Sequence, residues 1–341
     1  MKDLAEELGV STVTVSKALA DKEGVSEAVR QKVKELAQKR GYRMNRVARQ
    51  FRQGSTKSIG VLLSDAFGQG PDTFYWGVQS RLALQLTQRD YSSVLEIITP
   101  AMEQDKALPS VLEQGKADGV IVLGQMSEEY IDFLSLQGIP VVLLDFYTDN
   151  EKYPSVTTNN LHSTFISTSY VIGCGHNHIG FLGNIRHSTS SIQDRFLGFY
   201  KAMLEHDLFI REEWIINDRT DRGRLLERFD LPQSLPTAFV CNCDESAFRL
   251  LEQLSHMGIR VPEEVSLIGF DDSIYSHISK PPITTVAVDV ETLTRKAAEL
   301  ITHCVNHAVS NSASVVVPGR MVYRDSVRVL DESNNNGGAA R

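Results

Sequence analysis

The sequence has little cysteine, little tryptophan and no long apolar run. Its 341 residues include four cysteines and two tryptophans, and four cysteines are too few for a scaffold held by disulfides. No stretch approaches the roughly 18 consecutive apolar residues of a membrane-spanning helix. The charged beginning MKDLAEEL has no apolar core of an export signal. We therefore expect a cytoplasmic protein without membrane contact, divided by its length into two or three domains.

Motifs for a metal, a nucleotide or a catalytic nucleophile are also missing. The chain has no P-loop, no Gly-x-Ser-x-Gly elbow and no Gly-x-Gly-x-x-Gly fingerprint after its first apolar run. His303 and His307 lack the glutamate of a zinc protease motif, and CNC at 241–243 and HNH at 176–178 stand alone. We interpret these residues as packing or surface residues. The sequence predicts no metal, no cofactor and no enzymatic activity.

Charge is distributed unevenly along the chain. Residues 1–57 carry thirteen Lys or Arg against seven Asp or Glu, a net +6, whereas the remaining residues carry a net −14. A basic head on an acidic body favours contact between the head and a polyanion. Charge alone leaves open a basic, solvated helix bundle.

The head has the pattern of three short helices. The segment DLAEELG has helical apolar spacing, and Gly9 can adopt the positive φ that ends a helix. Ser11 is a good N-cap for a second helix, and Ser26 for a third that ends at Gly41. Two short helices around a glycine turn, followed by a third, predict a helix-turn-helix bundle. The positions expected to pack inward are Leu4, Ala5, Leu8, Val15, Ala18, Leu19, Val29, Val33, Leu36 and Ala37.

The outward side of the second helix carries small hydroxyl side chains. In this fold the second helix enters the major groove of DNA. Small hydroxyls there allow close approach and bond phosphates, while longer side chains read base edges. The residues that share this side are Thr12, Val13, Ser16 and Lys17.

From Ser58 onward, apolar runs alternate with helical segments. The runs are IGVLL, SVLEII, GVIVL and PVVLLD, followed by HIGFLG, EWII, TAFVC and VSLIGF. This rhythm predicts right-handed βαβ units in two doubly wound lobes of parallel sheet. Ligands of such folds lie beyond the carboxyl ends of the strands, here in the cleft between the lobes. The expected helices are 73–88, 102–114, 128–137, 160–173, 191–206 and 244–257, with crossings near 158, 288 and 315.

These segments resemble the LacI–GalR family of transcriptional regulators. The resemblance is carried by MKDLAEELGVSTVTVSKAL and GVSEAVRQKVKELAQKRGYRMNRVARQFRQGSTKSIGVLLSD in the head, and by GHNHIGFLG, SSIQDRFLGFYKAM, GIRVPEEVSLIGFDD, PPITTV and YRDSVRVL in the core. It implies a small all-α helix-turn-helix head and an α/β core of two doubly wound lobes, similar to periplasmic sugar-binding proteins.

The expected domain organisation follows from the resemblance and from composition. The DNA-binding domain covers 1–43, a hinge helix or linker 44–57, and the effector-binding and dimerisation core 58–330. In the core, the first lobe spans about 58–158 and 288–314, and the second about 159–287 and 315–330. The tail 331–341 is polar and Gly-rich, which predicts disorder.

The resemblance also implies which residues contact DNA. Thr12 and Val13 occupy base-reading positions, and Lys17 stands where the family usually has Arg, although Lys cannot form a bidentate fork on guanine. Phe51 stands at the position of a leucine that wedges into the minor groove, where an apolar wedge remains sensible. Arg46 belongs to a basic segment with helical spacing, for which a flexible linker is the alternative. Phosphate contacts are implied for Thr14, Ser16, Tyr42 and Asn45.

In the core, the resemblance implies an effector site. Arg195 matches an arginine that bonds ligand hydroxyls, and the alternative is a surface arginine of a helix. Asp271, at the end of LIGFD, matches an acidic hydroxyl acceptor, and the alternative is an N-cap of the following segment. Asp145 ends VVLLD and faces the same cleft from the first lobe. The weaker candidates are Asp65, Ser191 and Asp244.

Several carboxylates with an arginine indicate a hydroxyl-rich ligand, so a sugar or sugar derivative fits. The family's usual Asn-Pro-Phe-Phe is GQGP at 68–71 here, and its Asn-Asp is Cys243-Asp244. Because both departures lie at the cleft, the resemblance assigns no particular effector. Phe74 and Trp76 can stack on a sugar face, but at this spacing they are more typical of a core.

The sequence thus predicts a homodimeric, ligand-responsive repressor of carbohydrate-related genes that binds a palindromic double-stranded DNA operator. A single small head would bury too little surface for tight specific binding, which favours the dimer. The alternative is a solute-binding protein with the same core fold and no DNA role. That alternative leaves the basic head unexplained.

Overall fold

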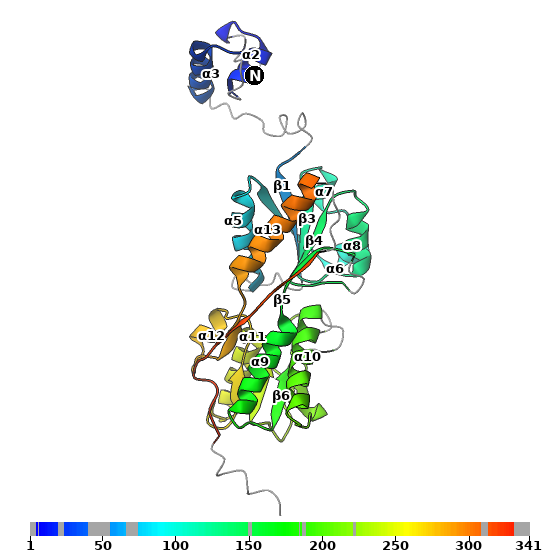
Figure 1. Cartoon of the computed structure of the whole chain (residues 1–341), viewed down its shortest axis with the longest axis vertical. Coiled ribbons are helices and arrows are strands. Elements are labelled where there is room, and N and C mark those ends of the chain that lie inside the picture. The colour runs from blue at the N-terminus through cyan, green and yellow to red at the C-terminus, as the bar shows by residue number, and fades with distance from the viewer. Residues whose placement is uncertain are drawn as a thin grey trace, which may run out of the picture. The chain divides into compact units, whose positions relative to one another are not determined.

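The chain forms two compact units, Met1–Thr56 and Lys57–Arg341, each with its own core. The computed structural model (Figure 1) describes residues 5, 7–19, 24–39, 55–65, 74–148, 152–183, 185, 189–220, 223–307 and 313–330. Within these ranges, no helix is both long enough and apolar enough to cross a bilayer.

The first unit is a small helical bundle. Helices α2 (Thr12–Leu19) and α3 (Glu27–Lys39) pack together, and residues 5, 7 and 8 are also helical. Gly9 has a φ of 62°, and the Ser11 hydroxyl accepts a hydrogen bond from the Thr14 amide at 3.0 Å. The glycine turn and the N-cap predicted from the sequence are therefore confirmed. The core holds Ala5, Val15, Ala18 and Val33, with Leu8, Val29 and Leu36 packed against it.

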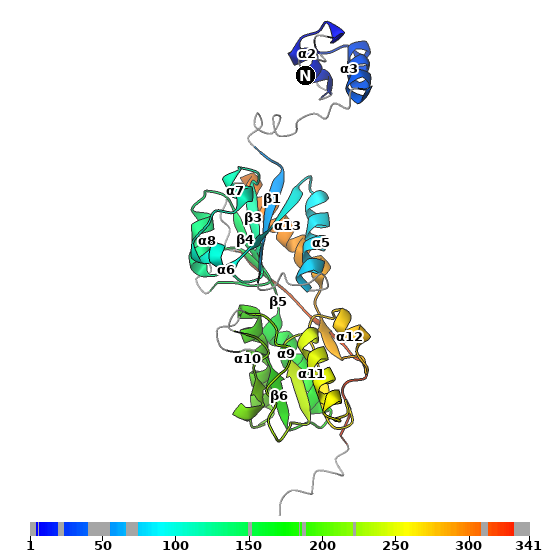
Figure 2. The same ribbon diagram turned by 180° about the vertical axis from the view of Figure 1, so that it is seen from behind.

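The first lobe of the second unit is a six-stranded parallel sheet in the order β11-β5-β4-β3-β1-β2. Helices α5 (Phe74–Thr87) and α13 (Val290–His307) cover one face (Figures 1 and 2). Helices α6 (Pro100–Gln104), α7 (Ser110–Glu113) and α8 (Glu128–Ser135) cover the other. The strands are β1 (Ser58–Ser64), β2 (Ser92–Ile98), β3 (Gly119–Leu123), β4 (Val141–Leu144), β5 (Ser155–Thr158) and β11 (Ser314–Val317).

The second lobe has a four-stranded parallel sheet in the order β7-β6-β8-β9. Helices α9 (Asn160–Gly173) and α10 (Ser190–Glu205) pack on one face, and α11 (Asp244–His256) packs on the other. A 3₁₀ turn (Glu212–Trp214) precedes β7, and α12 (Ile274–Ile278) follows β9. The strands are β6 (Ile179–Leu182), β7 (Ile215–Ile216), β8 (Ala238–Cys241) and β9 (Ser266–Ile268).

Within the described ranges, three chain segments run between the lobes. They are the connections from β5 to α9, from β10 (Thr285–Ala287) to α13, and from β11 to β12 (Arg320–Val322). β10 and β12 pair antiparallel with each other. The two parallel sheets are the doubly wound lobes that the alternating pattern predicts, with strand ends directed at the seam between the lobes.

Two predicted elements are wrong in extent. The helix expected at 102–114 is two helices, because Lys106 has a φ of 50° and Pro109 precedes α7; proline provides no amide hydrogen to continue a helix. The strand expected at EWII is reduced to Ile215–Ile216, since Glu212–Trp214 is a 3₁₀ turn.

Gly198 sets the close approach of α10 to α9. A Cβ atom at Gly198 would lie 2.2 Å from the Leu161 carbonyl oxygen and 2.9 Å from the Phe165 amide nitrogen. We predict that Gly198→Ala lowers the free energy of unfolding by about 1–3 kcal/mol, because the two backbones must separate. Urea denaturation measures the change.

Gly77, on α5, provides the matched control. A Cβ atom there would meet no atom within 4 Å. Gly77→Ala is expected to stabilise the protein by about 0.5–1 kcal/mol through helix propensity. Equal effects of the two substitutions would show that the approach of α9 and α10 is not tight.

Candidate functional site

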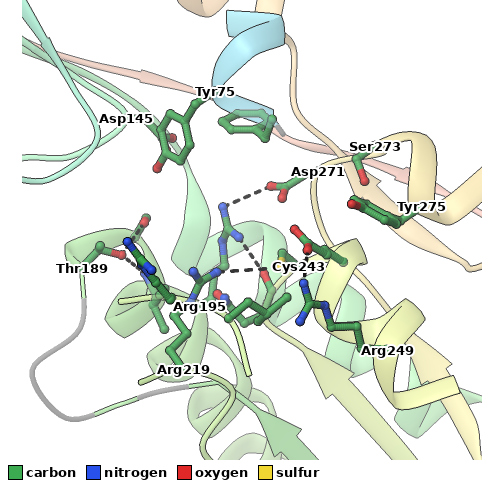
Figure 3. Close-up of a pocket in the computed structure, with 17 residues that line it drawn as sticks. Tyr75, Asp145, Thr189, Arg195, Arg219, Cys243, Arg249, Asp271, Ser273 and Tyr275 are labelled. Carbon is green, nitrogen blue, oxygen red and sulfur yellow. Dashed lines mark hydrogen bonds and ion pairs between the residues drawn. The ribbon is translucent and has the colours of Figure 1, made fainter. Parts of the chain in front are cut away.

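A cavity of about 270 Å³ lies between the two lobes, at the carboxyl ends of their strands (Figure 3). Phe74, Tyr75 and Asp145 line it from the first lobe. The second lobe contributes the N-terminal ends of α10 and α11, the loop after β7 and the segment after β9. This is the cleft that the strand-end rule predicts for a doubly wound core.

Asp145 carries an acceptor without a partner into this cavity. It follows β4 with a φ of 70°, and its side chain is buried. The Tyr75 hydroxyl donates to Oδ2 at 2.9 Å, whereas Oδ1 has no hydrogen-bond partner in the described part of the chain. Burial raises the pKa of Asp145, and the charge of Arg195 opposes that rise. A ligand hydroxyl can satisfy this oxygen.

Arg195 is buried among three acceptors from different elements. Nε donates to Asn160 Oδ1 at 2.9 Å and Nη1 to the Asn242 carbonyl at 2.6 Å. Nη2 lies 3.4 Å from Asp271 Oδ1, and the guanidinium lies 3.8 Å from the centroid of the Phe270 ring. With a relative exposure of 6%, Arg195 is not the surface arginine that was the alternative.

Asp271 faces Arg195 from the end of the β9 segment. Its amide donates to the Val286 carbonyl at 2.8 Å, and its φ is 107°. Burial raises the pKa of Asp271 to about 7; the charge of Asp145 adds to the rise, and Arg195 and Arg219 oppose it. The N-cap of α12 is Ser273, so the alternative role of Asp271 as that N-cap is wrong. Backbone strain of this kind at Asp145 and Asp271 is typical of functional sites.

The three weaker candidates for the effector site, Asp65, Ser191 and Asp244, do not all line the cavity. Ser191 lines the cavity, with its hydroxyl 2.8 Å from the Thr189 hydroxyl. Asp65 does not line it, and instead faces Arg224 across the lobes at 3.7 Å.

Asp244 also lies outside the cavity lining, which corrects its assignment as an effector residue. Its carboxylate is fully buried and accepts hydrogen bonds from the Thr285 hydroxyl at 2.6 Å and the Ser273 amide at 2.7 Å. These bonds connect the start of α11 to β10 and to the segment after β9, and together with full burial they give the carboxylate a structural role away from the cavity.

Several lining residues were missed by sequence reasoning. Arg219 and Arg224 belong to the loop after β7, and Arg249 lies on α11. The charged stretch NDRTDRGR directly after a strand was the available signal. Phe74 lines the cavity and also packs against the first-lobe core, whereas Trp76 does not line it.

The residues predicted to contact DNA fall in the first unit, where fewer side chains are described. Lys17 is exposed, and Thr14 is half-buried with its hydroxyl 2.8 Å from that of Ser11. The side chains of Thr12, Val13 and Ser16 lie outside the description, although their backbone is part of α2. Four further predicted contacts lie outside the described residues: Tyr42, Asn45, Arg46 and Phe51.

Comparison with known proteins relates both units to one group. Residues 1–45 match the family model described as bacterial regulatory proteins, lacI family, and residues 168–327 match a periplasmic binding protein-like domain. The HTH-type transcriptional repressor PurR of Vibrio parahaemolyticus is 27% identical over 336 residues, which cover 97% of this chain and 99% of that protein.

Two solved structures have the same fold. The Lac repressor dimer bound to operator and the anti-inducer ONPF aligns with a TM-score of 0.77 at 21% identity, covering 96% of this chain and 98% of that chain. A complex of the transcriptional regulator CelR with cellobiose aligns with a TM-score of 0.69 at 21% identity, covering 95% and 98%. The chain therefore belongs to the lacI family of bacterial regulatory proteins: it is a DNA-binding transcriptional regulator with a periplasmic-binding-protein-like core, and not an enzyme.

Proposed function

We propose that this regulator is a homodimeric repressor of carbohydrate-related genes, and that a sugar-like effector in the interlobe cavity controls its binding to a palindromic operator. One observation carries the proposal: Asp145 from one lobe and Arg195 with Asp271 from the other converge on one cavity. Acceptors and donors placed together in this way match a ligand rich in hydroxyls. The CelR complex, a regulator of the same fold, holds cellobiose.

Effector binding is coupled to operator binding by a change in the angle between the lobes. Polar contacts join them at present: Gln125 Oε1 accepts from the Ser190 amide at 2.6 Å, and the Tyr147 hydroxyl donates to Asp194 at 2.9 Å. A ligand that touches both lobes stabilises one angle over others by its differential affinity. A change in the lobe angle alters the spacing of the two DNA-binding heads in a dimer, and so their fit to the two half-sites of the operator.

The segment that leads from the head into the core is attached to the first lobe. The Lys57 amide donates to Asp118 Oδ2 at 2.9 Å, and its ammonium lies 4.5 Å from the centroid of the Tyr91 ring. A rotation of the first lobe is therefore transmitted to the start of this segment.

Selection of bound fragments from a random DNA pool tests the proposal directly. Full-length protein is expected to enrich one palindromic sequence, and a sugar that binds the protein is expected to change its affinity for that sequence. Enrichment of no sequence, or an operator affinity that no bound sugar alters, contradicts the proposal.

Lys17 is expected to carry part of the base preference because it is exposed on α2. Lys17→Ala should change the preferred base at one position of each half-site, by about 1–3 kcal/mol of discrimination. Repeating the selection with the variant measures this. A uniform loss of affinity, with the salt slope reduced by about one, would make Lys17 a phosphate contact. Lys32→Ala, which removes an exposed lysine of α3, is the control.

Arg195→Ala is expected to weaken effector binding about ten- to a hundredfold. Each hydrogen bond to a charged group contributes roughly 1.5–3 kcal/mol, and about 1.4 kcal/mol corresponds to one decade in Kd. Calorimetric titration measures the loss, and operator binding without effector should stay nearly unchanged. Arg260→Ala, an exposed ion-pair residue of the same lobe, is the control. An unchanged Kd for Arg195→Ala removes Arg195 from the site.

The ionised carboxylate of Asp271 is expected to destabilise the effector-free protein at alkaline pH. Its folded-state pKa of about 7 lies above the ordinary value of 3.8, so the native state holds the proton more tightly than the unfolded chain. This contribution to stability is fully present below about pH 4 and is lost as the pH rises through 7.

Asp271→Asn is therefore expected to raise the Tm at pH 8. The corresponding gain in the free energy of unfolding is up to about 4 kcal/mol. The stability should also depend less on pH between pH 4 and pH 7. The substitution should weaken effector binding at the same time. Thermal unfolding across this pH range measures the effect, with Asp207→Asn, an exposed aspartate also at positive φ, as control. A lower Tm at pH 8 would mean that the ion pair with Arg195 outweighs the cost of burial.

A further inference from the structure

The cavity has a donor-rich wall opposite Asp145. Arg219 and Arg224 belong to the loop between β7 and β8, which closes on itself through a bridge between Arg219 and Leu225 and a 2.8 Å bond from the Thr220 amide to the Arg224 carbonyl. Figure 3 shows Tyr75 and Asp145 on one side of the cavity, with Arg195, Arg219 and Cys243 across from them. The wall therefore presents guanidinium groups to whatever occupies the cavity.

Arg219 is held from behind but poorly satisfied. Nη1 donates to the Gly223 carbonyl at 3.0 Å, and Nη2 has a thiol, Cys243 Sγ, at 3.9 Å. Nε is buried and has no hydrogen-bond partner among the residues that the structure describes. Among the described residues, Asp218 forms an ion pair with Arg219, with Oδ2 3.6 Å from Nε, but Asp218 is fully buried and does not line the cavity. A thiol is a weak acceptor, so a ligand oxygen beside Nη2 would form a stronger hydrogen bond than Cys243 provides.

The other lining arginines are engaged differently. Arg195 already donates to three protein acceptors. Arg249 is neutralised by Glu245 at 2.7 Å and donates to the Leu226 carbonyl at 2.9 Å. Arg224 is half-exposed at the mouth, 3.7 Å from Asp65. Arg219 differs from these arginines because its ion-pair partner, Asp218, does not line the cavity, and because one of its Nη groups faces only a thiol, which is a weak acceptor.

Two helix N-termini add to the positive potential on this side. The first turn of α10 lines the cavity through Ser191, and the first turn of α11 through Glu245, with Cys243 as its N-cap. Helix N-termini favour bound anions. On the opposite side, burial raises the pKa of Asp145 and Asp271, which reduces the negative charge that an anion would meet.

We propose that the effector is an acidic monosaccharide derivative, a sugar acid or a sugar phosphate, whose carboxylate or phosphate binds Arg219. Its hydroxyls lie at Asp145, Arg195 and Asp271, and Arg224 approaches the acidic group from the mouth. The inference rests on the proposed function for the location of the effector. The planar fork of a guanidinium donates hydrogen bonds to two oxygens of such a group at once, which a single hydroxyl cannot match.

The cavity size fits one sugar ring. Its volume of about 270 Å³ lies just below the range of about 300–1,000 Å³ that ligand pockets cover. A ligand of this size can direct ring hydroxyls at Asp145 while its acidic group contacts Arg219 across the cavity.

Calorimetric titration of full-length protein with matched sugars tests the charge requirement. The sets are D-glucose, D-galactose, D-mannose and D-ribose, each with its aldonate and its terminal phosphate, and the hexoses also with their uronates. In at least one set, an acidic member should bind at least about tenfold more tightly than the neutral sugar, with an affinity that falls as salt is added. Whether the carboxylate or the phosphate binds identifies the group. Equal or tighter binding of the neutral sugars, or binding of none, overturns the inference.

Variants of Arg219 test the assignment to this side chain. Arg219→Gln should weaken binding of the acidic sugar about ten- to a hundredfold and leave the neutral sugar of the set within about twofold. Arg219→Lys should recover part of the loss, because it keeps the charge without the fork. Arg249→Ala removes a cavity arginine that Glu245 already neutralises, and should change the Kd less than about threefold. Equal losses in Arg219→Gln and Arg249→Ala overturn the assignment.

Folding of each variant is checked by thermal unfolding without sugar. If Arg219→Gln does not fold, the salt dependence of the wild-type affinity decides between a charged and a neutral contact. Failure here is distinct from failure of the proposed function. Neutral sugars that alone bind and alter operator affinity leave the function standing, whereas an acidic sugar that binds through Arg219 without altering operator affinity leaves only this inference standing.

Discussion

The buried guanidinium of Arg195 connects the parts of the second lobe that face the cavity. Its acceptors lie at the first residue of α9, just after β8 and just after β9. A buried charge is tolerated only when it is paired and hydrogen-bonded, so these three segments must meet at one place. Gly198, one turn further along α10, allows the approach to α9 that brings Arg195 to Asn160. The position of Asp271, and with it the shape of the site, depends on this cation.

The arrangement of this site lowers the stability of the protein when no effector is bound. Among the described residues, no hydrogen-bond partner faces the buried atoms Asp145 Oδ1, Asn242 Oδ1 and Arg219 Nε, and Asp145 and Asp271 have positive φ. Groups of this kind lower stability in return for binding capacity. A ligand that satisfies them gains affinity from groups that the folded chain leaves unsatisfied, and it gains most if it touches both lobes.

How much the sequence predicts depends on whether a feature is local. The strands in IGVLL and GVIVL are buried on both faces, so their apolar runs identify them, and strand ends then locate Asp145 and Asp271. The strand SVTT, β5, is equally buried but carries hydroxyls, and no apolar run marks it. Asp244 occupies the same kind of strand-end position, yet Thr285 and Ser273 use its carboxylate. The placement of Arg219 depends on loop closure with Leu225, a pairing that no local pattern reports.

An effector held by one lobe alone would not operate a switch. Binding at Arg219 and Arg195 anchors a ligand to the second lobe at any lobe angle. Those contacts therefore add affinity without favouring one lobe angle over another. The preference for one lobe angle arises where the ligand reaches Asp145, Tyr75 and Phe74 of the first lobe. The distances from an anchored ligand to these residues change with the angle. The coupling free energy is therefore a property of the first-lobe contacts. Because coupling is reciprocal, operator DNA must change effector affinity by the same factor by which effector changes operator affinity.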